Sequence, residues 1–466
     1  MNMNSMNSLP LGTPPRGASE ATHFLAQHPQ VSQILLILTD INGIARGKLV
    51  RPHELESLYT QGRPLPSSIL SLNVLGEDVD STGLVWEVGD MDCLARPVPG
   101  TLKPCPWLAD TAQLLLSMDP EAGQPAAAAD PRLALVRVVD GLGQDGLHPV
   151  LACELEFYLL DADGWQRGEV QPARSSQGHS LSQTQVYGVH ELEAMRPFFS
   201  ELYRCSRIQG LPAETAISEY APGQFEVTLT HRASALQAVD EAVQFKRLIK
   251  GVADRHGMLA CFMAKPFSAR AGSGMHIHVS LNDEKGNNRF ASADPAGNAL
   301  MHHAIGGMAA TITDAMAIFA PHANSYRRFR RSSYAPTAAT WGVNNRSVTF
   351  RVPTGAPPTR HVEHRASGAD ANPYLAAAAV LAGLHYGIRT CIDPGPALQG
   401  NAYEQAQQPL NLNWYATLYA FEQSDFIRSY FGAPFQRIFT ALKREQCERF
   451  YSEVTTLDHD WHLRLA

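Results

Sequence analysis

Two glutamates inside an otherwise apolar run constrain the fold of this chain more than any other feature of its sequence. The run spans residues 150–160 and carries Glu154 and Glu156 two positions apart. Because side chains alternate between the two faces of a strand, both carboxylates lie on one face, opposite Leu155 and Phe157. Such a pair on an ordinary strand faces solvent. Here the surrounding apolar residues predict an interior strand, with two carboxylates directed into the protein.

A second pair of glutamates flanks a turn signal in residues 216–229. The sequence Ala-Pro-Gly-Gln at 221–224 predicts a four-residue hairpin turn that places Glu219 opposite Glu226. Like charges directly opposite each other destabilise a ladder, so this pairing predicts a cation between the two carboxylates. The alternative is a solvated hairpin with two exposed acids.

Two further segments carry polar side chains at alternating strand positions. These side chains are His276, His278 and Ser280 in residues 272–281, and His361 and Glu363 directly after Arg360. An H-x-H pair is a weak indication of metal binding, because a single histidine is more often a hydrogen-bonded core residue than a ligand. Neither segment alone therefore indicates a metal site.

The four segments together supply five glutamates and a histidine from strands. A donor set rich in carboxylate oxygen suits Mg²⁺ or Mn²⁺, whereas a zinc site would contain more histidine or cysteine. Two such ions side by side fit phosphoryl chemistry, in which cations bridge phosphate oxygens. The arginines that could bind phosphate or carboxylate are Arg327, Arg328, Arg330, Arg331, Arg346 and Arg351. The pattern predicts a divalent-metal enzyme that handles phosphate.

The charge of the chain argues against two classes of partner. Lys plus Arg number 38 and Asp plus Glu number 45, giving a net charge of −7, so the chain lacks the basic excess that binds nucleic acid or an anionic membrane. The seven cysteines form no C-x-x-C pair, which favours a reduced compartment. The apolar runs at 34–38 and 375–384 are well short of the ~20 residues that span a bilayer. We therefore expect a cytoplasmic protein that binds neither nucleic acid nor membrane.

The order of predicted elements indicates an α+β protein. Short strands are predicted on both sides of Gly43 in residues 31–50, and near 69–75, 83–88 and 112–118. Strands at 150–160, 217–229, 275–281 and 347–352 then alternate with helices at 133–143, 190–209, 233–256, 298–319 and 372–389. Asp130-Pro131 and Asn372-Pro373 are typical helix starts. The predicted domains are a tail over residues 1–18, a small β domain over 19–118 and a large catalytic domain over 119–466.

In order and spacing, six motifs of this chain resemble those of the glutamine synthetase family. They are the Glu154/Glu156 strand, the Glu219/Glu226 pair, Lys265-Pro-Phe with Gly272–Ser280, Asn324–Arg328, Asn345–Pro353 and Ala371–Leu375. The resemblance covers residues 30–460. It implies a β-grasp-like N-terminal domain and a catalytic domain whose curved antiparallel sheet surrounds a two-metal funnel. It also implies a ring-shaped homo-oligomer, a dodecamer of two stacked hexamers with each active site at a subunit boundary.

The same resemblance implies a role for each motif residue. One metal would be held by Glu156, Glu219 and Glu226, and the other by Glu154, His276 and Glu363. Nucleotide contacts would fall on Glu214, His278, Ser280, and His361 or its neighbour Arg360. The catalytic arginines would be Arg346, Arg351 and Arg328, and glutamate would contact Arg328, Arg365 and Gly272. The implied cofactors are ATP, as a substrate, and two or more Mg²⁺ or Mn²⁺ ions per active site.

Departures from the family pattern bear on the amine substrate. Glutamine synthetases place a glutamate, which helps to accept the ammonium proton, six residues after the motif arginine; here Tyr334 follows Arg328 at that spacing. The asparagine that usually precedes the glycine-rich motif is Ala271. The segment with the ammonium-binding aspartate is missing, and Asp78 or Asp80 lies nearest to its place. These losses leave an open, partly apolar path for a bulkier alkylamine.

The sequence therefore resembles the γ-glutamyl-amine ligases of this family, typified by γ-glutamylputrescine synthetases. It predicts an ATP-dependent ligase that joins the γ-carboxylate of L-glutamate, through γ-glutamyl phosphate, to putrescine or another polyamine. The alternatives are a monoamine or aromatic-amine ligase and a divergent glutamine synthetase that uses ammonia. An amidohydrolase would carry its H-x-H pair early, with further histidines on later strands. An inactive homologue would usually have lost a metal glutamate, and this chain has not.

Overall fold

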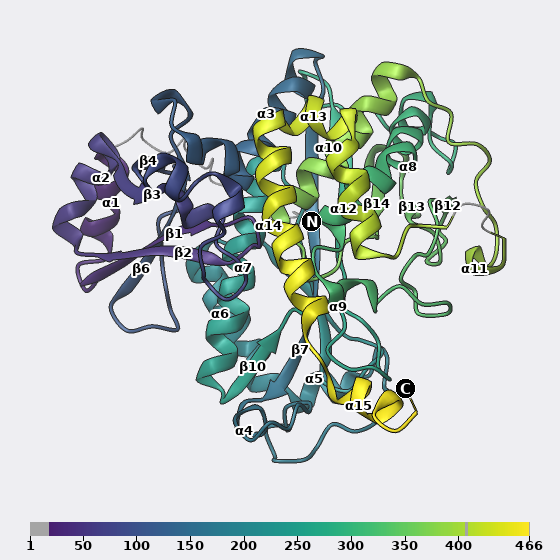
Figure 1. The fold of residues 1–466 in the computed structure, drawn as a ribbon, viewed down its shortest axis with the longest axis horizontal. Helices are drawn as coiled ribbons and strands as arrows, with labels where there is room; N and C mark the ends of the chain where they lie inside the picture. The colour runs from purple at the N-terminus through teal and green to yellow at the C-terminus, as the bar shows by residue number, and fades with distance from the viewer. Residues whose placement is uncertain (1–17, 406–408, 466) are drawn as a thin grey trace, which may run out of the picture.

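The computed structural model describes residues 18–405 and 409–465, which form two β-sheets with helices packed around them (Figure 1). The first sheet has the strand order β2-β1-β6-β4-β3, with β5 paired to β6. Its strands are β1 Gln33–Thr39, β2 Ala45–Val50, β3 Arg63–Pro66, β4 Asp92–Pro97, β5 Lys103–Pro104 and β6 Thr111–Met118. Strands β1 and β6 run parallel, and the other pairs of this sheet are antiparallel. The predicted tail lies outside the described residues, apart from Ala18, which begins α1 (Ala18–Gln27).

The hairpin predicted around Gly43 is confirmed, and it attaches the first sheet to the rest of the chain. Asp40 closes the turn, because its Oδ1 accepts a hydrogen bond from the Ile44 N–H at 2.8 Å. Gly43 has a φ of 77°, and a Cβ there would lie 3.3 Å from Asn372 Cα. Asn372 Nδ2 donates in turn to the Asp40 carbonyl at 2.8 Å. The turn therefore packs against the N-terminus of the helix that follows Asn372.

Two short strands predicted near 69–75 and 83–88 are wrong. Residues Ser67–Leu70 and Trp86–Val88 instead form 3₁₀ turns. The apolar side chains of these runs do not share one environment, because Leu84 is buried whereas Leu75 and Trp86 are exposed. A short apolar run therefore does not by itself predict a strand.

The second sheet carries the polar strands that the sequence singled out. Its order is β12-β13-β14-β11-β7-β9-β8, with β10 paired to β7, and only β12 and β13 run parallel. The strands are β7 His148–Asp161, β8 Ala213–Ser218, β9 Gln224–Leu229, β10 Met258–Cys261, β11 Met275–Asn282, β12 Trp341–Val343, β13 Phe350–Val352 and β14 Val362–His364. Strand β7 lies inside the sheet with most of its residues buried, which confirms the predicted interior strand.

The helices cover both sheets and confirm the predicted helix starts. Their bounds are α2 Leu55–Gln61, α3 Pro131–Gln144, α4 Ala162–Gln166, α5 Val189–Ala194, α6 Arg196–Gln209, α7 Ala235–Arg255, α8 Ala299–Phe319, α9 Ala323–Tyr326, α10 Pro373–Thr390, α11 Ala402–Gln405, α12 Trp414–Gln423, α13 Asp425–Phe431, α14 Ala433–Ser452 and α15 Thr456–His462. Asp130 and Asn372 accept hydrogen bonds from the first N–H groups of α3 and α10. Helix α10 packs against α8 and α3, and α7 packs against β7 and β10. Among the described residues, none of the helices is long and apolar enough to cross a membrane.

Candidate active site

The polar faces of the second sheet and its connecting loops surround a cavity of about 830 Å³. The predicted site residues that line it are Glu154, Glu156, Glu219, Glu226, Ala271, Gly272, His276, Arg328, Tyr334, Arg346, Arg351, Glu363 and Arg365. Folding therefore brings together residues from six separate segments of the chain. The predicted residues that do not line this cavity are Asp78, Glu214, His278, Ser280, Arg360 and His361.

The predicted pairing of Glu219 with Glu226 is wrong. Strand β8 pairs with β9 in a register that places Ile217 opposite Glu226. The Glu219 N–H donates to the Gln224 carbonyl at 2.9 Å, so the hairpin loop is residues 220–223, one residue earlier than predicted. Glu226 instead lies directly opposite Glu156 on β7. Two glutamates do lie opposite each other on neighbouring strands, but the strands are β7 and β9 rather than β8 and β9.

Three of the carboxylates have too little positive charge around them. Burial, and then the neighbouring Glu219 carboxylate, raise the pKa of Glu156 to about 8. Burial and the Glu154 carboxylate raise the pKa of Glu226 well above its usual range, and burial also raises the pKa of Glu219. A divalent cation among these side chains would offset their repulsion and favour the ionised form of each.

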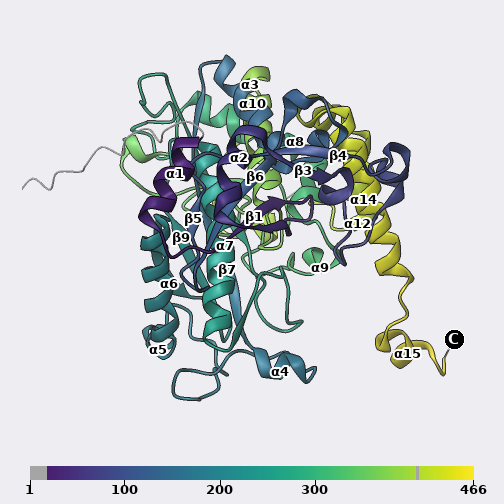
Figure 2. The ribbon, with the colours of Figure 1, turned by 90° about the vertical axis from the view of Figure 1, so that its left-hand side faces the viewer.

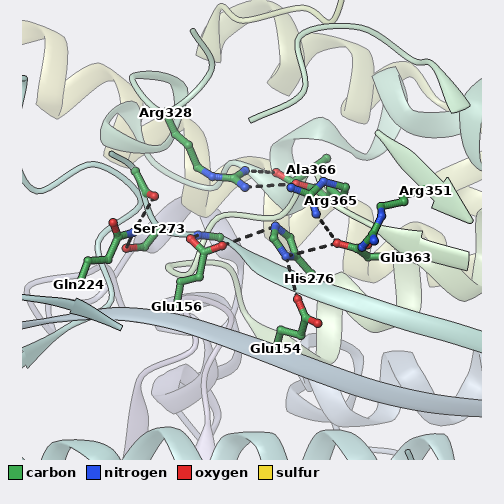
Figure 3. Close-up of polar contacts among 12 residues, drawn as sticks. Glu154, Glu156, Gln224, Ser273, His276, Arg328, Arg351, Glu363, Arg365 and Ala366 are labelled. Carbon is green, nitrogen blue, oxygen red and sulfur yellow. Dashed lines mark hydrogen bonds and ion pairs between the residues drawn. The ribbon is translucent and has the colours of Figure 1, made fainter. Parts of the chain in front are cut away.

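The two remaining glutamates, Glu154 and Glu363, lie beside arginine and histidine side chains. Glu363 is 1% exposed, and it accepts hydrogen bonds from Arg351 Nη1 at 2.7 Å and from Arg365 Nη1 (Figure 3). Burial is the largest single effect and would raise the pKa of Glu363, but the Arg365 guanidinium and the His276 and His278 rings together outweigh it and lower the pKa to about 2. His276 Nδ1 lies 3.1 Å from Glu154 Oε2 and 3.6 Å from Glu363 Oε1. Acidic and basic groups thus alternate along this side of the cavity.

Among the described residues, two groups of three donor atoms that include carboxylates lie close enough to hold one cation each. They are Glu154, Glu226 and His276, and Glu154, His278 and Glu363, with the donor atoms of each group within 4.8 Å of one another. Each group offers two carboxylates and one imidazole, a set that suits Mg²⁺ or Mn²⁺. The predicted ligands Glu156 and Glu219 belong to neither group, whereas His276, predicted to join Glu154 and Glu363, lies 3.1 and 3.6 Å from their carboxylates. The residues fit a divalent ion, and the choice and number of ions stay predictions.

The glycine-rich segment before β11 makes room for Arg328. A Cβ on Gly274 would lie 2.5 Å from Arg328 Nη2, and one on Gly272 would lie 2.8 Å from Arg328 Cγ. Arg328 is 4% exposed and donates to the carbonyls of residues 365–366 at 3.2 and 3.0 Å. The Gly274 N–H donates to Glu156 Oε2 at 2.7 Å. The glycines therefore let a buried guanidinium lie beside the acidic cluster.

The residues predicted to contact nucleotide are only partly brought together. His278 Nδ1 lies 3.0 Å from His361 Nε2, and Ser280 is buried two positions further along the same face of β11. Arg360 is buried, whereas Glu214 is exposed on β8. Of the five, the two histidines are the pair in direct contact.

The amine end of the cavity is aromatic rather than acidic. The ring of Tyr334 lies 5.4 Å, centroid to centroid, from that of Tyr220, and both residues line the cavity. The Ala271 carbonyl accepts a hydrogen bond from the Tyr158 hydroxyl at 2.7 Å. Asp78 is exposed and does not line the cavity of this chain. Tyr220 was not predicted as a site residue, and its place next to a metal-ligand candidate is the signal that could have found it.

Glutamates on the strands and arginines from the loops line one cavity. This arrangement is typical of enzymes that transfer phosphoryl groups with divalent metal ions. A family model described as the glutamine synthetase catalytic domain matches residues 128–462. The chain belongs to the glutamine synthetase family.

Three similar proteins refine this assignment. The chain is 37% identical to γ-glutamylputrescine synthetase PuuA of Escherichia coli (strain K12), over 96% of this chain and 95% of that protein. It is 32% identical to a glutamate–isopropylamine ligase of a Pseudomonas species, over 94% and 95%. A solved structure described as a GmaS/ADP complex is 26% identical with a TM-score of 0.83, over 95% of this chain and 99% of that one. These findings confirm the predicted fold class and the predicted enzyme class, an ATP-dependent glutamate–amine ligase.

Proposed function

We propose that this chain joins the γ-carboxylate of L-glutamate to putrescine or another polyamine, with γ-glutamyl phosphate as the intermediate. The reaction class is supported by the activities for which the two relatives at 37% and 32% identity are named. The observation that carries the choice of amine is the Tyr220–Tyr334 pair at the cavity. Two phenols cannot replace a carboxylate that takes a proton from ammonium at neutral pH, but they provide apolar and π surface for an alkylamine.

Divalent metal ions fit the acidic cluster and are used by this family. We assign one ion to Glu156, Glu219 and Glu226, and the other to Glu154, His276 and Glu363. The raised pKa values of Glu156 and Glu226 support this, because burial and then repulsion between carboxylates raise them, and a nearby cation would favour the ionised forms. When bound, such ions neutralise charge on transferring phosphate.

The arginines of this chain would orient the substrates for two transfers. Arg328 and Arg365 are proposed to bind glutamate carboxylates, and Arg346 and Arg351 to stabilise phosphate charge. A γ-carboxylate oxygen of glutamate attacks the γ-phosphorus of ATP, and ADP leaves. The amine nitrogen then attacks the acyl carbon, the bond from that carbon to the phosphate oxygen breaks, and the amine loses a proton.

Two loops at the cavity, one carrying Tyr334 and the other Tyr187, have an unusual backbone that supports a functional role. Ser332, Tyr334 and Tyr187 each have a φ of 58°, in the left-handed region that non-glycine residues rarely adopt. Tyr187 and Tyr334 both line the cavity. Such conformations cost about 1–3 kcal/mol each and cluster at functional sites. Aromatic faces attract an ammonium group within about 6 Å, so these rings are suited to the second ammonium of a diamine.

Phosphate release from ATP tests this function directly. With glutamate and Mg²⁺ present, we expect putrescine or spermidine to stimulate release well above ammonia, isopropylamine and an aromatic amine. Stimulation by isopropylamine alone would instead establish a monoamine ligase. Stimulation by ammonia alone would contradict the argument from Tyr334.

Replacing Tyr334 by glutamate should shift the amine preference toward ammonia. A carboxylate at this position restores a group that binds ammonium and accepts its proton, and general-base groups typically contribute 10²–10⁴-fold. We expect Tyr334→Glu to raise the ratio of ammonia to putrescine kcat/KM by about tenfold or more. The control is Tyr419→Glu, at a tyrosine that is 62% exposed and lies outside the cavity. An unchanged ratio in Tyr334→Glu would show that this position does not select the amine.

We also propose self-association into a ring-shaped homo-oligomer, as the family resemblance implies. Helix α15 lies apart from the rest of the chain (Figure 2). Trp461 in this helix is 62% exposed, and Leu463 after it is 76% exposed. A second copy of the chain would cover these apolar side chains. Size-exclusion chromatography with light scattering measures the assembly, and a monomer would contradict it.

A further inference from the structure

Three imidazoles from separate segments meet next to the acidic cluster. His231 follows β9, His278 lies on β11 and His361 precedes β14, with ring centroids 5.1–5.9 Å apart. One nitrogen from each ring lies within 4.8 Å of the other two. His278 is buried, His361 is half-buried and His231 is exposed, so the group opens to solvent on the His231 side.

The hydrogen bonds around two of these rings leave nitrogen facing nitrogen. His361 Nδ1 lies 2.8 Å from the Thr359 carbonyl, which can only accept, so Nδ1 carries the proton and Nε2 presents its lone pair. His278 Nε2 lies 2.9 Å from Glu154 Oε1, an arrangement that leaves His278 Nδ1 for the other side. His278 Nδ1 and His361 Nε2 are 3.0 Å apart. This separation fits an N–H···N hydrogen bond with His278 Nδ1 as the donor, and it also fits two lone pairs directed at one metal ion.

The hydrogen bond from His361 Nδ1 to the Thr359 carbonyl is typical of a histidine that binds a metal ion through its other nitrogen. In such sites each ligating imidazole donates its other N–H to a carbonyl or a carboxylate, which fixes the tautomer and the ring orientation. Thr359 holds His361 in this way, whereas His278 Nε2 lies 2.9 Å from Glu154 Oε1 without making a hydrogen bond to it. With Zn–N distances of about 2.0–2.1 Å in a tetrahedron, ligand nitrogens lie roughly 3.3 Å apart, close to the observed separation of the His278 and His361 nitrogens. A ring nitrogen of the exposed His231 lies within 4.8 Å of a nitrogen of each of the other two rings.

We propose that His231, His278 and His361 form a binding site for a borderline-soft divalent ion such as Zn²⁺, with a fourth position open to water. Its all-imidazole donors distinguish it from the carboxylate-rich cluster, which suits Mg²⁺ or Mn²⁺. Since His278 and His361 are also proposed nucleotide contacts, an ion held here would oppose ATP binding. This regulatory consequence rests on the proposed function, whereas the metal site does not.

Cobalt(II) absorption in the full-length protein tests the site. Excess Mg²⁺ fills the two proposed sites of the acidic cluster, neither of which is assigned His278, and tetrahedral Co²⁺ is detected by its visible absorption. We expect one tetrahedral Co²⁺ per chain, an affinity at least tenfold lower in His231→Ala, and a thiolate charge-transfer band in His231→Cys. His53→Ala, at an exposed histidine elsewhere on the surface, should match the wild type. Equal affinity and spectra in the wild type and His231→Ala, or no tetrahedral spectrum in the wild type, would overturn the site.

Adding ATP separates the metal site from its proposed consequence. Release of Co²⁺ at saturating Mg²⁺ and ATP would support competition at the nucleotide end. Retention of Co²⁺ would overturn that competition and leave the three-histidine site standing. A chain that binds Co²⁺ but shows no amine-dependent phosphate release would count against the ligase function alone.

Discussion

Replacing Glu363 by glutamine is expected to abolish turnover. Glutamine keeps the volume of the side chain but removes the charge that Arg351 and Arg365 share. Glu363 is 1% exposed, so both guanidinium groups would lose a buried counter-ion that water cannot replace. The proposed metal ion would lose an anionic ligand at the same time. Loss of a group that only orients a metal ligand already costs about 10–100-fold, so we expect kcat to fall by at least 100-fold.

The measurement is amine-dependent phosphate release, together with direct Mn²⁺ binding. A matched control is Glu284→Gln, which makes the same change at an exposed carboxylate outside the cavity and should retain wild-type kcat. Circular dichroism distinguishes an inactive folded variant from an unfolded one. Wild-type turnover in Glu363→Gln would refute its assignment as a metal ligand.

Local sequence patterns predicted which strands carry the site, because alternation along a strand is a local property. Glu154 and Glu156 share a face of β7, and His276 and His278 share a face of β11, as the period of two requires. The neighbours of these residues across the sheet could not be read in the same way. Glu156 lies opposite Glu226, 70 positions away in the chain, and that register depends on the whole sheet.

The other errors arose where a local sequence motif is compatible with more than one structure. The Pro-Gly turn was located, but its loop starts at Tyr220 rather than at Ala221, and this shift alone changes the partner of Glu226. Helix starts were predicted correctly at Asp130 and Asn372, because an N-cap followed by proline has few other uses. His231 carries no local signal, since it lies just beyond a strand and only the fold brings it to His278.

Arg346→Ala should slow catalysis without destabilising the protein. Arg346 is exposed at the cavity, and within the part of the chain that the structure describes its side chain makes no hydrogen bond or ion pair. Its removal therefore leaves no hydrogen-bond partner unpaired, in contrast to Glu363, although Glu219 loses a nearby positive charge that lowers its pKa. Removal of one preorganised donor to transition-state charge costs about 10²–10³-fold in kcat. We expect a loss of this size with an unchanged urea unfolding midpoint.

Two further variants separate the role of Arg346 from a general effect of positive charge. Arg331→Ala removes an equal charge from an exposed residue that lines the same cavity, and we expect its kcat to change less than about tenfold, because charges that are not aimed at the reacting group act weakly through water. Arg346→Lys keeps the charge but loses the planar fork that binds phosphate through two hydrogen bonds, so only partial recovery is expected. Equal kcat values for Arg346→Ala and Arg331→Ala would contradict a specific role for Arg346. The fall should appear in kcat more than in KM, because a donor that acts on developing charge stabilises the transition state more than bound substrate.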